Sequence, residues 1–327
     1  MILRTLTALA SPAGARSRLS AFYFHRTLER PDPLLPGEPD ARMFDSILQW
    51  IGSQFRVLDP LEACERLYDG SLPSRAAIIS FDDGYRDNYT VALPLLLRRR
   101  MPAVFFVATG FLGDGAMFND RVIEAVRRCP DSSLRAPAAG GDGEAVYPIG
   151  SDAERRTAIH RILAAIKHLH PEEREERVRR LEREAGVVPR SDLMMDASQV
   201  AALHHAGMHV GGHTRSHPIL RALPDAQAEA EIRGGADDLA AIVGQRPALF
   251  AYPNGRHGKD FDERHVRMVE RTGFAFAFTT EPGAADRRSL PFELPRFTPW
   301  DRTPSRFAIR ALRNLATSHS RRSWPTH

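Results

Sequence analysis

Two adjacent aspartates, Asp82 and Asp83, occur in the stretch IISFDDGYRDNY (78–89), where they follow an apolar run and precede Gly84. Neighbouring carboxylates repel each other, so a fold that keeps both in one place makes use of their negative charge. One carboxylate of such a pair can fix a cation while the other takes a proton. The letters DDG are also common in turns and at helix N-caps, so the pair alone leaves a purely structural role open.

Two histidines four residues apart, His213 and His217, lie in the stretch GGHTRSHPIL (211–220). A glycine pair precedes them and Pro218 follows, which favours a short loop or a single helical turn. In either conformation the two imidazoles can converge. Two histidines and one carboxylate, with the remaining positions open, are typical of a catalytic rather than a structural metal site.

Three further stretches carry weaker signals. In FAYPNG (250–255), Tyr252 and Pro253 follow an apolar run and can form a groove wall with a pocket of backbone amides. FYFHR (22–26) ends in His25, and ELPRFTP (293–299) places Arg296 between prolines. Taken singly, FAYPNG indicates only a turn and ELPRFTP only a rigid loop. A histidine such as His25 is more often a core or surface residue than a catalyst.

The elements that must position these residues alternate along the chain. Buried, non-alternating apolar runs followed by helical patterns predict a parallel sheet or barrel, whose strands bring their C-terminal ends to one rim. The aspartate pair, the histidine pair, FAYPNG and FYFHR each lie at, or directly after, the end of such a run. The pattern predicts strands at 19–25, 76–81, 102–109, 207–213, 248–253 and 274–279, and helices at 41–55, 60–70, 89–100, 226–244 and 262–273.

One interval interrupts this alternation, and we interpret 113–189 as an insertion into a barrel that spans 19–312. It contains an expected loop at 137–145 and a charged, helical run at 152–186, which is most simply a solvated helix face. The chain thus divides into an N-terminal segment, 1–18, the barrel with its insertion, and a tail, 313–327, that we expect to be disordered.

The composition is that of an ordinary soluble globular protein: 327 residues, 43% of them hydrophobic, with a formal net charge of +4. Lys167 and Lys259 are the only lysines, and no basic run is interleaved with aromatic residues, so we expect no nucleic-acid partner. Cys64 and Cys129 are predicted to be buried free thiols. No run approaches the ~20 apolar residues of a transmembrane helix.

Taken together and in this order, the motifs resemble those of the polysaccharide deacetylase family, the NodB-homology carbohydrate esterases (family 4). SFDDGYRDNY is similar to the first family motif, HTRSH to the second and FAYPNG to a variant of the third. The resemblance extends from about Phe22 to Pro299. It is closer to the branch that processes bacterial exopolysaccharides, because FYFHR is similar to that branch's N-terminal histidine element. The implied fold is a deformed (β/α)7 barrel with a helical insertion.

The same resemblance implies roles for five residues. Asp83, His213 and His217 would hold one divalent metal, most simply Zn²⁺, although Co²⁺, Ni²⁺ or Fe²⁺ also suit these ligands. Asp82 would be the general base that deprotonates the attacking water, and His25 the general acid that protonates the departing amine.

The sequence departs from the family pattern in two places. The third motif usually carries an arginine just before its prolines, and this chain has Ala251 there, so Arg296 is the expected substitute partner of the base. No fourth motif of the aspartate–tryptophan type is found, which leaves open what orients His25. A backbone amide near Tyr252 and Pro253 is expected to share the oxyanion.

The resemblance implies metal-dependent removal of N-acetyl groups from N-acetylated sugars of a bacterial polysaccharide or its precursor. Peptidoglycan, a lipid-linked sugar and a non-catalytic carbohydrate-binding role remain alternatives, and the insertion is expected to decide among substrates. The N-terminal apolar patch is shorter than the core of a signal peptide, which favours the cytoplasm or its membrane face, whereas an exopolysaccharide role favours the cell envelope. The sequence leaves the oligomeric state open.

Overall fold

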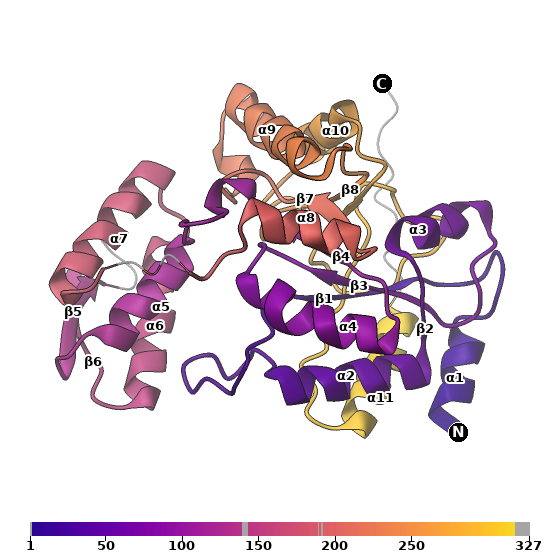
Figure 1. The fold of residues 1–327 in the computed structure, drawn as a ribbon, viewed down its shortest axis with the longest axis horizontal. Coiled ribbons are helices and arrows are strands. Elements are labelled where there is room, and N and C mark those ends of the chain that lie inside the picture. The colour runs from indigo at the N-terminus through magenta and orange to yellow at the C-terminus, as the bar shows by residue number, and fades with distance from the viewer. Residues whose placement is uncertain (1, 139–142, 189, 191, 318–327) are drawn as a thin grey trace. The chain divides into compact units, whose positions relative to one another are not determined.

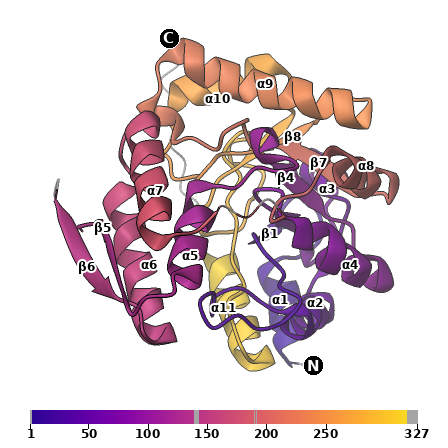
Figure 2. The ribbon, with the colours of Figure 1, turned by 60° about the vertical axis from the view of Figure 1, so that its left-hand side comes forward.

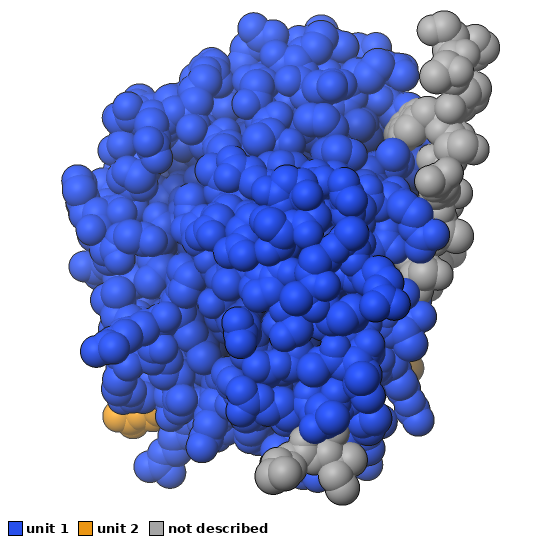
Figure 3. Space-filling model, turned by 90° about the vertical axis from the view of Figure 1, so that its right-hand side faces the viewer, with its two compact units in different colours: residues 1–29, 38–112, 195–327 blue, residues 30–37, 113–194 orange. Residues whose placement is uncertain are grey.

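The computed structural model of the chain describes residues 2–138, 143–188, 190 and 192–317. Contacts within it define two compact units, which Figure 3 colours separately. Unit 1 comprises residues 1–29, 38–112 and 195–327, and unit 2 comprises residues 30–37 and 113–194. Most of unit 2 is therefore the interval that interrupts the strand–helix alternation of the sequence.

Unit 1 is built on one parallel sheet with the strand order β1-β3-β4-β7-β8-β9, and β2 pairs with β3 beside this path (Figures 1 and 2). All six predicted strands are present; the strand predicted at 76–81 has the predicted bounds, and the other five are shorter than predicted. The unpredicted β2 has only two residues, too few to give a sequence pattern. The strands are β1 (Ser20–Phe24), β2 (Arg56–Val57), β3 (Ala76–Phe81), β4 (Val104–Val107), β7 (His209–Gly212), β8 (Leu249–Ala251) and β9 (Phe276–Phe278).

A segment without regular strand assignment, 294–297, lies between β9 and β1, and we call it the closing segment. Phe278 forms a parallel bridge with Leu294, and Phe22 forms one with Phe297. The Leu294 N–H donates to Ala277 O over 2.9 Å, and the Phe297 N–H donates to Ala21 O over 2.7 Å. The sheet therefore curves round into a deformed (β/α) barrel, the fold that the family resemblance implied.

The strand side chains explain why the barrel forms. Every residue of β3 and β4 is buried, as expected for strands covered on both faces. Alternate residues belong to different cores: Ile79 and Phe105 pack outward with the helices, whereas Ile78 and Phe106 pack with the residues inside the barrel. Fully burying one such side chain contributes about 1.5–3 kcal/mol.

Eight helices accompany this sheet in the described part of unit 1. The helix predicted at 89–100 begins as a π-helix, Asn88–Ala92, and three helices were not predicted: α1, α8 and α11. The last of these extends into the expected tail, of which residues 318–327 lie outside the described part of the chain. The helices are α1 (Ile2–Ala10), α2 (Ala41–Gln54), α3 (Pro60–Asp69), α4 (Leu93–Arg99), α8 (Ala197–His205), α9 (Asp225–Val243), α10 (Glu263–Thr272) and α11 (Pro304–Ala316).

Unit 2 has its own hydrophobic core, which includes Val126, Ile162 and Val178. The charged run 152–186 forms two helices rather than one, because a capping box at Ser151 starts the first and the second starts at a proline. A hairpin flanks the expected loop 137–145, of which residues 139–142 lie outside the described residues. The elements are α5 (Phe118–Arg128), β5 (Ser133–Pro137), β6 (Glu144–Pro148), α6 (Asp152–Ile166) and α7 (Pro171–Ala185).

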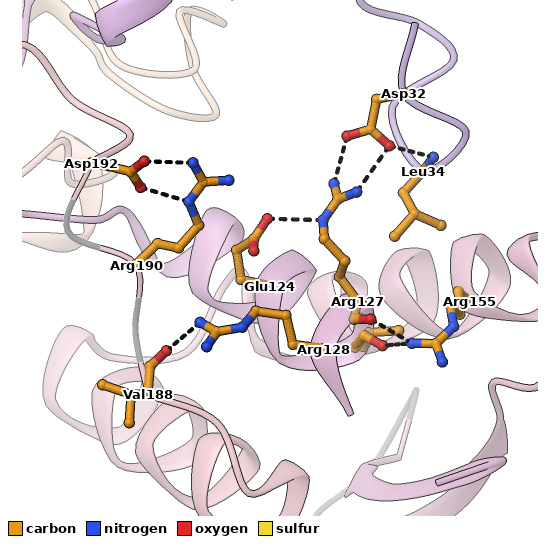
Figure 4. Close-up of polar contacts among 10 residues, drawn as sticks. Asp32, Leu34, Glu124, Arg127, Arg128, Arg155, Val188, Arg190 and Asp192 are labelled. Carbon is orange, nitrogen blue, oxygen red and sulfur yellow. Dashed lines mark hydrogen bonds and ion pairs between the residues drawn. The ribbon is translucent and has the colours of Figure 1, made fainter. Parts of the chain in front are cut away.

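Polar contacts tie the short segment 30–37 to the rest of unit 2 (Figure 4). The Arg127 guanidinium donates to both carboxylate oxygens of Asp32, over 3.0 and 2.6 Å, and its Nε donates to Glu124 over 2.9 Å. Arg155 donates to the backbone carbonyls of Val126 and Arg127 at the end of α5. Through Arg127, a segment distant in sequence is thus joined to the rest of the same unit.

The thiol prediction is confirmed, since Cys64 and Cys129 are free and buried. Burial raises the pKa of the Cys64 thiol well above its usual value, so this group stays protonated and unreactive. Among the described helices, none has the length and apolar character that crossing a bilayer would require.

Candidate metal and catalytic site

The candidate residues of unit 1 lie at one rim of the barrel, because each follows the C-terminal end of a strand or lies on the closing segment. Asp82 and Asp83 follow β3, His213 follows β7 and His25 follows β1. Arg296 comes from the closing segment. Parallel strands bring their C-terminal ends together, which is why residues far apart in sequence meet here.

The structure brings Asp83, His213 and His217 together. Each of the two histidine Nε2 atoms lies 3.4 Å from Asp83 Oδ1, and one candidate ligand atom from each residue lies within 4.8 Å of the others. Asp83 Oδ1 is buried and has no hydrogen-bond partner among the described residues. A buried carboxylate oxygen without a donor is costly, and a divalent cation would satisfy it. The donor set therefore fits a metal ion.

The ring orientation of His213 supports the same assignment. Its Nδ1 lies 2.7 Å from the Ala251 carbonyl oxygen, which can only accept, so Nδ1 carries the proton and Nε2 presents its lone pair towards Asp83. Metal-ligating histidines are commonly oriented in this way. Burial lowers the pKa of His217 to about 4, so its imidazole is neutral near pH 7, as a metal ligand must be.

The backbone adopts unusual conformations where it presents these side chains. Asp83, Thr214 and His217 have φ values of 79°, 65° and 51°, in the left-handed region that non-glycine residues rarely adopt. Gly84 continues the turn after β3 with φ 91°. Strained residues of this kind persist only where the surrounding structure holds them, and they gather at functional sites.

Helix α9 holds the loop that carries the two histidines. Glu231 accepts hydrogen bonds from the backbone N–H groups of Arg215 and Ser216, over 3.0 and 2.7 Å, and Asp238 accepts two from the Arg215 guanidinium. A Cβ on Gly235 would lie 2.8 Å from the Thr214 carbonyl oxygen. Gly235 is thus needed for the close packing of α9 on the Thr214 backbone, a role that the sequence analysis missed.

The second aspartate, Asp82, forms a buried, bidentate ion pair with Arg296. The two terminal nitrogens of the guanidinium lie 2.6 and 2.7 Å from the carboxylate oxygens. Both residues are almost fully buried, with 2% and 1% of their surfaces exposed. The Arg296 Nε donates to Thr279 O over 2.9 Å, and the guanidinium carbon lies 4.6 Å from the centre of the Tyr23 ring.

The charge state of Asp82 follows from these contacts. Burial raises the pKa of this carboxyl, but the positive charge of Arg296, the neighbouring His213 and the hydrogen bonds from Arg296 outweigh it, so the pKa is lowered. Asp82 is therefore an ionised carboxylate near pH 7, able to accept a proton.

We expect Arg296→Lys to lower kcat by about tenfold or more, because lysine keeps the charge but loses the planar fork that fixes Asp82. Arg296→Ala, which leaves a buried carboxylate unpaired, is expected to lower the free energy of unfolding by ~3–5 kcal/mol. Steady-state rates and thermal unfolding measure the two effects. Arg267→Lys, on the exposed face of α10, is the control. A fully active Arg296→Lys enzyme would show that the fork is unimportant.

The second half of the first motif holds the loop that carries His25. The Asn88 side-chain amide donates to His25 O over 2.8 Å. Asp87 accepts from the Arg26 Nε over 2.8 Å and from the Thr27 N–H over 3.1 Å. The sequence analysis left open what orients this histidine, and it missed Asp87 and Asn88 because they pair with residues some 60 positions earlier.

Charges surrounding His25 favour its protonated form. Burial lowers the pKa of the imidazole, but the carboxylates of Asp83, Asp82 and Glu38 outweigh it and raise the pKa above its usual value. Glu38 is a further residue that the sequence analysis missed. It accepts a hydrogen bond from the backbone N–H of Arg26, and burial raises its own pKa.

The expectation for Tyr252 needs correction. Its side chain is fully buried and its ring stacks on that of Phe261, with 3.8 Å between centroids, so it faces the core. Its backbone N–H donates to Phe278 O over 3.1 Å within the sheet, and Pro253 has no N–H. Neither residue therefore offers an amide to an oxyanion, because the ladder between β8 and β9 extends to Tyr252.

The sequence matches a family model described as polysaccharide deacetylase over residues 69–140 and 145–277. A curated relative from Bacillus subtilis (strain 168), named "Putative polysaccharide deacetylase YxkH", is 22% identical over 255 residues. The match covers 77% of this chain and 62% of that protein, so the chain spans less than two thirds of the length of this curated relative.

Two solved structures are similar in fold. IcaB from Ammonifex degensii matches with a TM-score of 0.59 and 18% identity over 94% of this chain and 99% of its own. The Streptococcus pyogenes deacetylase PplD, solved with acetate, matches with a TM-score of 0.58 and 17% identity over 91% and 98%. At these identities the similarity establishes the architecture alone.

Proposed function

The chain belongs to the polysaccharide deacetylase family, whose members hydrolyse amide bonds of N-acetylated sugars, and from this we propose that it is a metal-dependent N-deacetylase. The observation that carries the proposal is the pair of neighbouring carboxylates in different environments. Asp83 faces His213 and His217 with an unsatisfied oxygen, whereas Asp82 is held by Arg296. Two carboxylates with two different partners suit a cation ligand and a base.

Asp83, His213 and His217 would hold the cation, most simply Zn²⁺, although Co²⁺, Ni²⁺ or Fe²⁺ suit the same ligands. When bound, such a cation polarises a carbonyl and lowers the pKa of a bound water from 15.7 to about 7. The geometry of His213, with its proton on Nδ1, leaves Nε2 available for this role.

Asp82 would accept the proton of the water that attacks the amide carbon. Its lowered pKa keeps it ionised, and Arg296 fixes both of its oxygens, so the carboxylate is oriented before substrate binds. A base positioned in this way contributes a factor of ~10²–10⁴ to the rate.

His25 would donate a proton to the sugar nitrogen as the carbon–nitrogen bond breaks. The neighbouring carboxylates raise the pKa of His25 above its usual value, which favours the protonated imidazole that this role requires. Without that proton the leaving group would be an amide anion, which is a very poor one.

We propose an N-acetylated polysaccharide or its precursor as the substrate. The resemblance of FYFHR to the exopolysaccharide branch favours an exopolysaccharide. Acetate, found in the Streptococcus pyogenes deacetylase structure, is the product that this reaction would release. Peptidoglycan and lipid-linked sugars remain alternative substrates.

The test combines metal analysis with acetate release by the purified chain from chitin oligomers, from peptidoglycan and from a lipid-linked N-acetyl sugar. We expect one divalent ion per chain and acetate release that stops on chelation and returns with Zn²⁺. The preferred substrate then identifies the class. Metal-independent sugar binding without acetate release would instead establish a non-catalytic carbohydrate-binding protein and refute the proposal.

We expect His25→Ala to remove the fall in rate at high pH that deprotonation of the acid causes in the parent enzyme. On an aryl acetate, whose leaving group needs no proton, the variant should lose much less activity than on an N-acetyl sugar. Rate–pH profiles on both substrates measure this. Equal losses on the two substrates would assign His25 a structural role.

A further inference from the structure

A basic cleft lies at the opposite end of the barrel from the metal and catalytic site. Its volume is about 630 Å³, and it lies beside the chain segments that lead into β1 and follow β9. Leu19 directly precedes β1 and forms an antiparallel bridge with Ala285. Ala285 in turn directly precedes residues 286–288, which line the cleft. Because the candidate site is at the C-terminal ends of these strands, the cleft is at their N-terminal ends. Its lining residues are Leu9, Ala10, Pro12, Ala15, Arg16, Arg18, Asp286, Arg287 and Arg288.

The polar side of the cleft is strongly positive. Four arginines face one aspartate, and Asp286 is already paired with Arg288 over 3.0 Å. Arg287 donates through Nε to Tyr68 O over 3.2 Å, which anchors the side chain at the cleft. Arg16 is exposed. Planar guanidinium groups match the geometry of phosphate oxygens, so this side suits a phosphate or phosphodiester group.

The apolar side of the cleft continues onto an exposed ridge of α1. Leu6 and Leu9 are 45% and 73% exposed, and their three-residue spacing places them on one face of the helix. Helix α1 packs on α11 and α2 through its other side, so this face has no partner within the described chain (Figure 1).

We propose that this cleft and ridge form a docking surface for a bilayer that contains anionic phospholipids. Arginines at the level of phosphate headgroups, together with leucines that enter the acyl boundary, are the two features of an interfacial helix. A free phosphate or a nucleic acid would account for the arginines but would leave both leucines in water. The docked chain would direct its catalytic rim away from the bilayer, towards a polysaccharide in the aqueous phase.

The test is flotation of the full chain with vesicles of phosphatidylcholine alone or mixed with phosphatidylglycerol. We expect binding to the anionic vesicles that weakens with added salt, since charges exposed at a surface are screened. Arg16→Gln/Arg287→Gln should lower partitioning about 25-fold, at roughly fivefold per arginine. Leu6→Ser/Leu9→Ser should lower it by about tenfold. The matched control, Arg42→Gln/Arg267→Gln, removes two exposed arginines elsewhere and should bind like the parent.

The proposal is overturned if the chain ignores anionic vesicles, or if the control lowers binding as much as the cleft variant. It is also overturned if heparin displaces the chain from anionic vesicles while Leu6→Ser/Leu9→Ser binds those vesicles as strongly as the parent. That result would identify a site for any polyanion. Acetate release in solution should be the same for all these variants. Vesicle binding needs no deacetylase activity, so this experiment and the test of the proposed function fail independently.

Discussion

Asp82→Asn is expected to lower kcat by a factor of ~10²–10⁴ while the chain keeps one divalent ion. Asparagine has nearly the same shape and can still accept a hydrogen bond from Arg296, but it cannot take a proton from water. Asp83, His213 and His217 are unchanged, so the cation ligands remain. Kinetics on a chitin oligomer and metal analysis of the same preparation measure both quantities.

Stability must be followed in parallel, because the change leaves the buried Arg296 charge without its counter-ion, which can cost ~3–5 kcal/mol. Assays are therefore run well below the unfolding temperature of the variant. Asp237→Asn, at an exposed position of α9, is the matched control and should behave like the parent. Loss of the metal together with activity would identify Asp82 as a ligand and reverse the roles of the two aspartates.

His213→Ala and His217→Ala are each expected to lose both the bound metal and measurable deacetylation. Each removes one of three protein ligands, and with fewer ligands the affinity for a divalent ion falls steeply. Asp83 would then be a buried carboxylate facing a single imidazole. Zinc titration with a competing chelator measures affinity, and acetate release measures activity.

The matched control for the histidines is His205→Ala, an exposed histidine at the end of α8. It should bind zinc and release acetate like the parent. If the His213 and His217 variants bind zinc as tightly as the parent, the ligand assignment is wrong. If they lose zinc but keep activity, the metal is not part of the reaction.

The candidate metal ligands were accessible from the sequence because the aspartate pair and the two histidines lie in short motifs at or near predicted strand ends. The barrel then brings strand ends together, so local patterns nominated His213, His217 and the aspartate pair, and the family resemblance selected Asp83 from that pair. The orientation of Tyr252 was not accessible in the same way. Whether a residue just past a strand faces the rim or the core depends on how far the backbone hydrogen bonds of the sheet continue. Here the hydrogen bonds between β8 and β9 extend one residue past β8, to Tyr252.

Residues that position the site were harder to find, because their partners are distant in sequence. Arg296 lies 214 positions after Asp82, and only the departure at Ala251 pointed to it. Glu231 and Gly235 belong to an ordinary helical pattern, and their contacts with the 214–216 backbone exist only after folding. A glycine pair inside α9 was the one local sign that something packs closely there.

Because the closing segment lies near the C-terminal end of the barrel sequence, the ribosome synthesises it after all the strands that it joins. A ribosome produces the aspartates after β3 and the histidines after β7 long before it reaches Arg296, so a nascent chain holds the proposed metal ligands while Asp82 still lacks its ionic partner. Until residues 294–297 emerge, β1 and β9 are open edges, which are prone to pairing with other chains. The same short segment both seals these edges and delivers the arginine to Asp82. Closure of the barrel and the ion pair of Asp82 therefore both depend on the same late-synthesised residues.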